Sequence, residues 1–249
     1  MTMLLLVFAL LMVGSYVTAR AVKRELEVAR LQSDFVSTVS HEFRSPLTAI
    51  RQLAELLQRG RVSTEEKRQE YYELISRESG RLSRLVENLL DFSRMEEGRK
   101  QYYFDRLDTA AWLRELGNGF QRGTVTLSIP AELPPILGDR AALTSAVDNL
   151  LDNAVKYSPP GAPVVCEVEA NGREVTIRVR DRGCGIASED REHVFEKFYR
   201  GAGEISRQVK GAGVGLSLVR QIVEAHGGTV DFDTRVGEGT VFRIRLKTA

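Results

Sequence analysis

A long run without glycine limits what this chain can fold into. From Ala21 to Arg59 there is no glycine, and Pro46 is the one proline. Apolar residues recur close to the spacing i, i+3, i+4, i+7 between Leu31 and Leu57. This period places them on one face of a helix. The run therefore predicts one long amphipathic helix, and Gly60 is expected to end it.

A second helix is predicted directly after this one. Ser63 and Glu66 match a capping box, with Ser63 as the N-cap and Glu66 reaching back. An apolar stripe then continues to about Glu97. Two long helices joined by a short loop form an antiparallel hairpin. A single hairpin leaves apolar surface uncovered, so we expect two hairpins to pair into a four-helix bundle and the protein to be a homodimer.

The N-terminal segment is apolar. Met3 to Ala19 carries no charged residue, and Arg20, Lys23 and Arg24 come directly after it. This length is near the lower limit for a membrane-spanning helix, and the basic residues favour a cytoplasmic location for the chain beyond Ala19. The alternative is a buried core helix. Only two residues precede the segment, so we expect no extracytoplasmic sensor domain here: either the chain is a fragment of a larger receptor, or it senses through the membrane or a partner.

The pattern changes after Gly98. Short alternating segments and amphipathic segments succeed one another, with Asp108 and Asp139 as expected N-caps and Asn171-Gly172 as an expected type I′ hairpin turn. The predicted strands are 101–104, 125–129, 164–169, 174–180, 229–233 and 240–246, and the predicted helices are 109–116, 140–157 and 214–225. This mixture predicts an α/β sandwich with a mostly antiparallel sheet.

Composition excludes several functions. The chain has 35 basic and 34 acidic residues, which gives no reason to expect nucleic acid as a partner. Its two cysteines form no CxxC pair, and it has three histidines. A disulfide scaffold, a zinc site and a histidine-rich metal centre are therefore not expected.

Three polar residues share one face of the predicted helix 140–157. Asn149, Asn153 and Lys156 are spaced i, i+4, i+7. Amide oxygens and a lysine suit a magnesium-bound triphosphate. The alternative is an ordinary solvated helix face.

Two glycine-containing segments add to this pattern. Asp181 ends a predicted strand and is followed by Gly183 and Gly185, so it is placed to accept a hydrogen bond from an exocyclic amine such as that of adenine, while the glycines permit close approach. A strand-end turn would look the same. The segment 211–217 leads into a helix, where backbone N–H groups bind phosphate. It lacks the GK[ST] of a P-loop. The alternative interpretation of 211–217 is a flexible lid. The segment 237–240 is expected to be a hairpin turn near that lid, and its alternative interpretation is a turn with a structural role only.

His41 and Glu42 lie within the first predicted helix. A histidine followed by a glutamate can be a phosphate acceptor with its own base, and the alternative is a solvated surface histidine. Five further motifs follow the His41-Glu42 pair in order: 149–157, DRGCGI at 181–186, 194–200, GAGVGLSLV and GEGT. With these six motifs the chain resembles the bacterial two-component sensor histidine kinases over about residues 20–249. The resemblance implies a transmembrane segment (1–19), a dimeric helical hairpin with the phosphohistidine (20–97), and a Bergerat-type ATP-binding domain (98–249).

The resemblance also implies roles. His41 would accept the γ-phosphoryl group of ATP and pass it to an aspartate of a response regulator, with Glu42 as base and Arg44 steadying phosphate charge. Asn153 would bind Mg²⁺ with help from Asn149, and Asp181 would read adenine. Phe195 and Phe198 would pack the lid against the bundle, and His193 and His226 would be structural. The remaining nucleotide contacts would come from Lys156, Tyr157, Gly183, Gly185, Ile186, Arg200, Lys210, Gly211, Gly213, Gly215, Leu216 and Thr240.

One position departs from the family pattern. The family usually has Thr or Asn four residues after the histidine, for dephosphorylating the response regulator, and this chain has Ser45. Phosphatase activity is therefore left open. Two other interpretations also stay open: another Bergerat-fold ATPase or serine kinase, and a non-catalytic dimeric membrane scaffold. The expected location is the bacterial cytoplasmic membrane, with the catalytic part in the cytoplasm.

Overall fold

The structure is a computed structural model of the chain. It describes residues 2–60, 62, 64–120, 125–201, 203, 209 and 213–249. Within the helices, the side chains of 2, 4–10, 24, 27, 28, 30–32, 34, 118 and 119 are outside the description.

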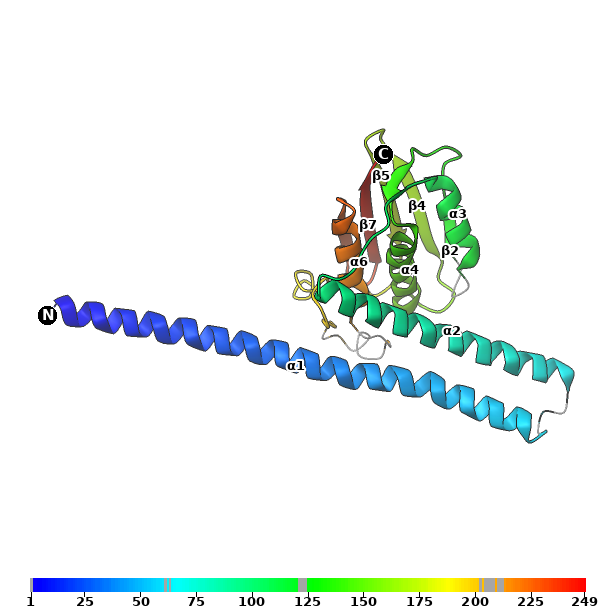
Figure 1. Cartoon of the computed structure of the whole chain (residues 1–249), viewed down its shortest axis with the longest axis horizontal. Coiled ribbons are helices and arrows are strands. Elements are labelled where there is room, and N and C mark those ends of the chain that lie inside the picture. The colour runs from blue at the N-terminus through cyan, green and yellow to red at the C-terminus, as the bar shows by residue number, and fades with distance from the viewer. Residues whose placement is uncertain are drawn as a thin grey trace.

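Two long antiparallel helices make up the first part of the protein (Figure 1). They are α1 (Thr2–Gln58) and α2 (Glu65–Glu96). Gly60 comes after α1 with a φ of +63°, as expected for a helix-ending glycine. The predicted N-cap of α2 is wrong by one residue: Thr64 Oγ1 accepts the Lys67 N–H at 3.3 Å, while Ser63 lies outside the described residues. The predicted hairpin is confirmed.

The predicted membrane segment is the N-terminal part of α1. Among the side chains that the structure describes, no helix has enough apolar length to cross a membrane. Residues 4–10 of the predicted segment are outside that set.

The second part is an α/β sandwich, as predicted. Its main sheet has five strands in the order β2-β4-β5-β7-β6. β2 pairs with β4 in parallel, and the other neighbours are antiparallel. A two-stranded sheet joins β1 to β3. The bounds are β1 (Asp105–Leu107), α3 (Thr109–Gly119), β2 (Val125–Ser128), β3 (Ile136–Gly138), α4 (Arg140–Tyr157), β4 (Val164–Ala170), β5 (Glu174–Arg180), α6 (Gly215–Ala225), β6 (Thr229–Arg235) and β7 (Gly239–Lys247).

Two local predictions in this part are wrong. The strand expected at 101–104 lies one segment later, at β1, because it is 105–107 that pairs with β3. The turn at Asn171-Gly172 is not type I′: only Gly172 has positive φ, and Asn171 Oδ1 instead accepts the N–H groups of Arg173 and Glu174. The side chain of Asn171 thus stabilises the turn through local hydrogen bonds, and its backbone does not adopt the left-handed conformation that a type I′ turn requires at both central residues.

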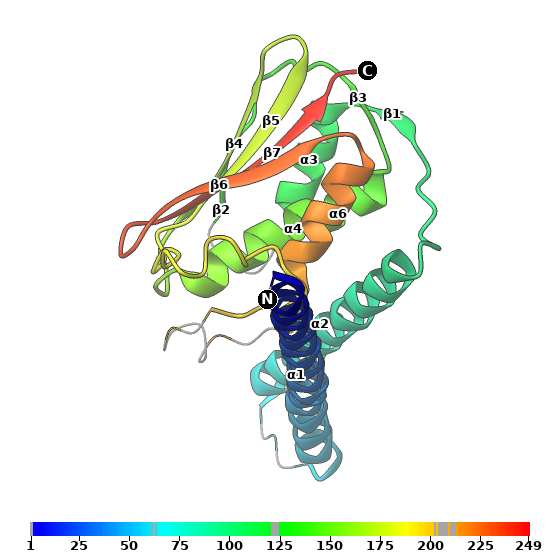
Figure 2. The ribbon, with the colours of Figure 1, turned by 90° about the vertical axis from the view of Figure 1, so that its left-hand side faces the viewer.

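The helices α3, α4 and α6 cover one face of the sheet, and the hairpin lies beyond them (Figure 2). The core is formed between sheet and helices. Trp112 of α3 is almost fully buried, as expected, and its Nε1 donates to Thr144 Oγ1 at 2.8 Å. The side chains of Asp108 and Asp139 cap α3 and α4 as predicted, through the N–H groups of Ala111 and Ala142.

Aromatic residues join the hairpin to the segment before α6. The ring of Phe198 lies 4.3 Å from that of Phe35 in α1 and 5.3 Å from that of Phe92 in α2, measured between centroids. The prediction for Phe198 is therefore confirmed. The prediction for Phe195 is wrong, because its ring packs instead on Phe232 and Phe242 of the sheet. Glu96 adds an ion pair to Lys197 at 2.6 Å and accepts from Gln221.

Asp139 ties the chain after the hairpin to α4. Its carboxylate caps α4 and also accepts the Tyr103 N–H at 3.0 Å. His226, predicted to be structural, accepts the Asp139 N–H on Nε2 and packs against Tyr102. Burial acts to raise the pKa of Asp139, but the N–H donors and nearby His226 outweigh it and hold the pKa below 3.8.

This geometry predicts a pH-dependent loss of stability. A carboxylate whose pKa is lower in the folded chain stabilises the fold above its unfolded pKa, and the effect is lost as pH falls through the folded pKa. At pH 7 we expect Asp139→Ala to lower the free energy of unfolding by about 1 kcal/mol, the usual value of an N-cap. The difference from wild type should shrink below a pH of about 3.8. Urea unfolding followed by fluorescence of Trp112, the one tryptophan, measures it.

Asp139→Asn is the matched control. Asparagine can cap the helix but does not titrate. It should retain most of the stability at pH 7 and show a weaker pH dependence than wild type. A constant difference between wild type and Asp139→Ala from pH 7 to pH 3 would contradict the prediction.

Candidate active site

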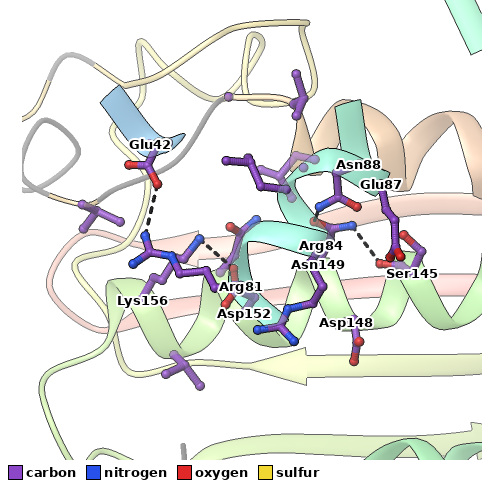
Figure 3. A pocket seen from close by; sticks show the side chains of 18 of the residues that line it. Glu42, Arg81, Arg84, Glu87, Asn88, Ser145, Asp148, Asn149, Asp152 and Lys156 are labelled. Atoms are coloured by element: carbon purple, nitrogen blue, oxygen red, sulfur yellow. Dashed lines mark hydrogen bonds and ion pairs between the residues drawn. The ribbon is translucent and has the colours of Figure 1, made fainter. Parts of the chain in front are cut away.

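A cavity of about 850 Å³ lies between the hairpin and α4 (Figure 3). Its size is in the range of small-molecule and cofactor sites. It is lined from three sides: Glu42 and Pro46 from α1, a row of α2 residues, and the polar face of α4 with the start of α6. Site residues predicted far apart in the sequence are thus brought to one place. Those in the lining are Glu42, Asn149, Asn153, Lys156, Tyr157, Arg200, Gly213, Gly215 and Leu216.

The polar face of α4 forms one wall. Asn149 Nδ2 donates to the Ser145 carbonyl at 2.8 Å, which leaves its Oδ1 directed away from α4. Lys156 forms an ion pair with Asp152 at 2.6 Å. Burial raises the pKa of Tyr157, against the opposing effect of the nearby Arg200 guanidinium. The predicted common face of Asn149, Asn153 and Lys156 is therefore what the structure shows.

The N-terminus of α6 lies beside this wall. Its N-cap, Val214, makes no side-chain cap hydrogen bond, and among the described residues no side-chain oxygen accepts from the N–H groups of its first turn. A Cβ on Gly215, its first residue, would lie 3.2 Å from Asn149 Oδ1 and 4.0 Å from Asn153 Nδ2. An uncapped helix start has partial positive charge and free donors. Together with the two amides it offers a site for phosphate groups.

Asp181 directly follows β5 and does not line the cavity. Gly183, Gly185, Ile186 and Thr240 do not line it either; the link to the cavity is Tyr157, whose backbone lies against Gly183. It is buried, and its Oδ1 accepts the N–H groups of Gly183 at 2.8 Å and Thr240 at 3.0 Å. Burial raises its pKa, although these two hydrogen bonds act in the opposite direction. Ile186 is tied to the same place through its N–H, which donates to Thr234 Oγ1. The second oxygen of Asp181 has no hydrogen bond among the described residues, so it remains available to an amine donor.

The glycines here are required by the protein's own backbone. A Cβ on Gly183 would lie 2.6 Å from the Tyr157 carbonyl oxygen, and one on Gly185 would lie 2.2 Å from that of Arg235. Gly185 and Gly213 also have positive φ, +71° and +72°. The sequence predicts that these glycines make room for a nucleotide. The structure adds a second reason for them, close backbone packing, which arises only where α4, β5 and the 235–239 turn come together.

The segment before α6 is described only in part. Arg200 lines the cavity and donates to the Val209 carbonyl at 2.7 Å. Lys210 and Gly211, both predicted to contact nucleotide, lie outside the described residues.

His41 and Glu42 face different directions. His41 is exposed and does not line the cavity, and Arg44 is also exposed, while Ser45 is half-buried. Glu42 is only 8% exposed and lines the cavity. Within the described part of the chain, its carboxylate is paired with Arg81 and not with His41. Neighbouring positions on a helix are rotated by about 100°, which explains the separation.

The cavity wall formed by α2 was missed by the sequence interpretation. Arg77, Arg81, Arg84 and Asn88 all line the cavity. Asn88 Nδ2 reaches Asn149 Oδ1 at 3.5 Å. Their spacing, i, i+4, i+7, i+11, is that of one helix face and can be read from the sequence. A polar stripe on a helix usually indicates a face exposed to solvent, so the spacing alone does not identify a binding site.

The donor set suits Mg²⁺ held partly by a nucleotide. The described residues contain no cluster of three or more His, Cys, Asp or Glu that could hold a metal by itself. Mg²⁺ is commonly bound through few protein oxygens plus substrate phosphates. The side-chain amides of Asn149 and Asn153 lie beside the helix start that suits phosphate, and an amide supplies one oxygen ligand each, which fits that arrangement.

Comparisons with known proteins agree with this geometry. The family model described as His Kinase A (phospho-acceptor) domain matches residues 31–98, and the one described as histidine kinase-, DNA gyrase B-, and HSP90-like ATPase matches residues 138–249. The chain belongs to the sensor histidine kinases. The histidine kinase SenX3 of Mycobacterium tuberculosis is 33% identical over 226 residues, which are 89% of this chain and 54% of SenX3.

Further relatives are similar over the same region. The sensor protein KdpD of Clostridium acetobutylicum is 29% identical over 229 residues, 90% of this chain and 25% of KdpD. The chain thus spans about half, or less, of the length of these curated relatives. The structure of ShkA in complex with AMPPNP is 29% identical, with a TM-score of 0.58, over 86% of this chain and 46% of that one. The histidine kinase AdeS of Acinetobacter baumannii has the same fold, with a TM-score of 0.56 and 22% identity over 84% of this chain and 98% of that one.

Proposed function

We propose that this chain is an ATP-dependent protein-histidine kinase that phosphorylates His41 and passes the phosphoryl group to an aspartate of a response regulator. The observation that carries the proposal is the shared cavity. Glu42, next to His41, lines the same cavity as Asn149, Asn153 and Lys156. The histidine-bearing helix and the candidate phosphate site thus lie on opposite walls of one space.

ATP would bind with its adenine amine at Asp181 and its phosphates at the α6 N-terminus. The free oxygen of Asp181 is a suitable acceptor, and the ShkA relative was solved with AMPPNP. Asn153, with Asn149, would hold Mg²⁺, and Lys156 and Arg200 would contact phosphate oxygens. The metal, when bound, would neutralise charge on the transferring phosphoryl group.

In the transfer itself, the outer ring nitrogen of His41 would attack the γ-phosphorus. The bond from phosphorus to the β–γ bridging oxygen breaks, and its electron pair leaves on ADP. Glu42 would take the proton from the other ring nitrogen. Because His41 lies outside the cavity in this structure, the hairpin must turn relative to α4 before transfer. A phosphohistidine formed in this way is reactive enough to pass its phosphoryl group to a carboxylate.

Two partners are implied by this assignment. A second copy of the chain would cover the exposed apolar residues of the hairpin, among them Leu47, Tyr72 and Leu90, in a four-helix bundle. The receiver domain of a response regulator would then approach His41 from its exposed side. Whether Ser45 supports dephosphorylation of the regulator is a separate question, which a Ser45→Ala variant answers.

The deciding experiment uses the whole chain in detergent and its His41→Gln variant, incubated with Mg²⁺ and γ-labelled ATP. We expect acid-labile label on wild type and none on the variant. Acid-stable label that persists in His41→Gln would favour the serine-kinase alternative. Bound ATP without label on either protein would favour the scaffold alternative. Either of these two outcomes would refute the proposal.

A further inference from the structure

The ion pair between Glu42 and Arg81 is the starting point. Arg81 Nη2 on α2 lies 3.1 Å from Glu42 Oε2 on α1, and the Glu42 side chain is only 9% exposed. The Arg81 side chain is 36% exposed, so the pair is partly buried and salt screens it less than a pair on the open surface. In Figure 3 the Arg81 guanidinium points across from α2 to Glu42. Glu42 therefore has a firm partner other than His41.

This pair conflicts with both roles expected of the cavity. A carboxylate paired with a guanidinium is a weaker base, so the pair opposes proton transfer from His41 to Glu42. In addition, Glu42 places negative charge in the wall of a space that must admit the negative phosphates of ATP. Arg81 offsets that charge in the resting arrangement.

Arg81 also lies within the nucleotide cavity. It lines the same space as Lys156 and Asn149, the residues proposed to meet the phosphates. A guanidinium binds phosphate oxygens through two parallel N–H donors, a geometry that suits it at least as well as a carboxylate. One side chain is thus positioned between two competing anionic partners.

We propose that Arg81 exchanges partners during the reaction. It pairs with Glu42 when no nucleotide is present, and it binds the γ-phosphate when ATP enters. The exchange releases the Glu42 carboxylate to the inner ring nitrogen of His41. Arrival of the third phosphate and release of the base would then be one event, and ADP, which lacks that phosphate, would leave Glu42 paired. This inference rests on the proposed function and adds Arg81 to it as a phosphate-binding and positioning residue.

Binding measurements test the exchange without requiring turnover. Dissociation constants for Mg·AMPPNP and Mg·ADP are measured by calorimetry on the whole chain in detergent. Arg81→Met should weaken AMPPNP binding about 10-fold, the usual value of one charge-assisted contact, and leave ADP binding nearly unchanged. Glu42→Gln should tighten AMPPNP binding, because Arg81 then has no competing partner. The double variant should match Arg81→Met.

Kinetics provide the second readout. Arg81→Met should lower the rate of His41 labelling about 100-fold at saturating ATP, and Arg81→Lys should recover part of it. Millimolar guanidinium ion should also restore part of the rate to Arg81→Met, which a purely structural role would not allow. Glu42→Gln should lower the rate because the base is lost, and adding Arg81→Met should lower it further, since the contact of Arg81 with the γ-phosphate does not depend on Glu42.

Arg68→Ala is the control variant. It breaks another Arg–Glu ion pair of α2, with Glu65 at 2.7 Å, but that pair is on the exposed first turn. It should match wild type in both assays. The inference is overturned if Arg81→Met changes AMPPNP and ADP affinity equally, or if its lost rate is not recovered by lysine or guanidinium. The two proposals can fail separately. If Arg81→Met weakens AMPPNP but not ADP binding and the wild type still places no label on His41, the proposed function is refuted while the exchange of partners by Arg81 is supported.

Discussion

Replacing Asn153 with alanine is expected to lower the rate of His41 phosphorylation by at least about 100-fold, because the metal's contribution to phosphoryl transfer is several kcal/mol. Asn153 lies beside Asn149 and the first residue of α6, where two side-chain amides meet the start of the helix. Removing the amide leaves the helix start intact and takes away the oxygen proposed for Mg²⁺. The measurement is labelling from γ-labelled ATP across a Mg²⁺ titration.

Metal removal should reproduce this defect. With EDTA present, ATP affinity of the wild type is expected to fall to that of Asn153→Ala, and the variant should respond little to added Mg²⁺. Asn171→Ala is the matched control, since Asn171 also has structural hydrogen bonds but lies in the β4–β5 turn. It should lose stability and not kinase activity. Normal labelling by Asn153→Ala would show that another residue holds the metal.

Much of this site was predictable because it depends on local spacing. Asn149, Asn153 and Lys156 share a face in any helix that covers them, and the caps at Asp108 and Asp139 depend on residues three positions away. The two-part architecture was predictable for the same reason. Helical and strand periods differ, and the change from one to the other after Gly98 is visible in the sequence.

What could not be predicted depends on contacts between distant segments. Nothing local distinguishes Phe195 from Phe198, yet one ring packs on the sheet and the other on the hairpin. Phe198 alone among the described non-glycine residues has a positive φ, +65°, a backbone conformation that the local sequence does not indicate. The role of Arg81 likewise appears only when α2 is placed against α4.

Hydrogen-bonding choices at segment ends were also beyond the sequence pattern. Ser63 and Thr64 are both good N-caps, and the pattern favoured the one with a glutamate three positions later. The structure uses Thr64. At 101–107, alternation alone could not say which residues would find a partner strand, since β1 is defined by its pairing with β3.

The glycine at 185 leads to a prediction that separates packing from nucleotide binding. If Gly185 only makes room for ATP, then Gly185→Ala should leave the nucleotide-free protein as stable as wild type. In the structure a Cβ there would lie 2.2 Å from the Arg235 carbonyl oxygen, on a backbone with φ of +71°. We therefore expect Gly185→Ala to lower the free energy of unfolding by about 3 kcal/mol or more without nucleotide, from strain and overpacking together.

Gly237→Ala isolates the two contributions. Gly237 is in the neighbouring turn with a similar φ of +82°, but a Cβ there would meet nothing within 4 Å. It should lose only about 1 kcal/mol from backbone strain. Urea unfolding followed by Trp112 fluorescence, without ATP, compares the three proteins. Equal losses for the two variants would mean that the turn at 235–239 can move away from Gly185, and that the glycine is needed there for its φ alone.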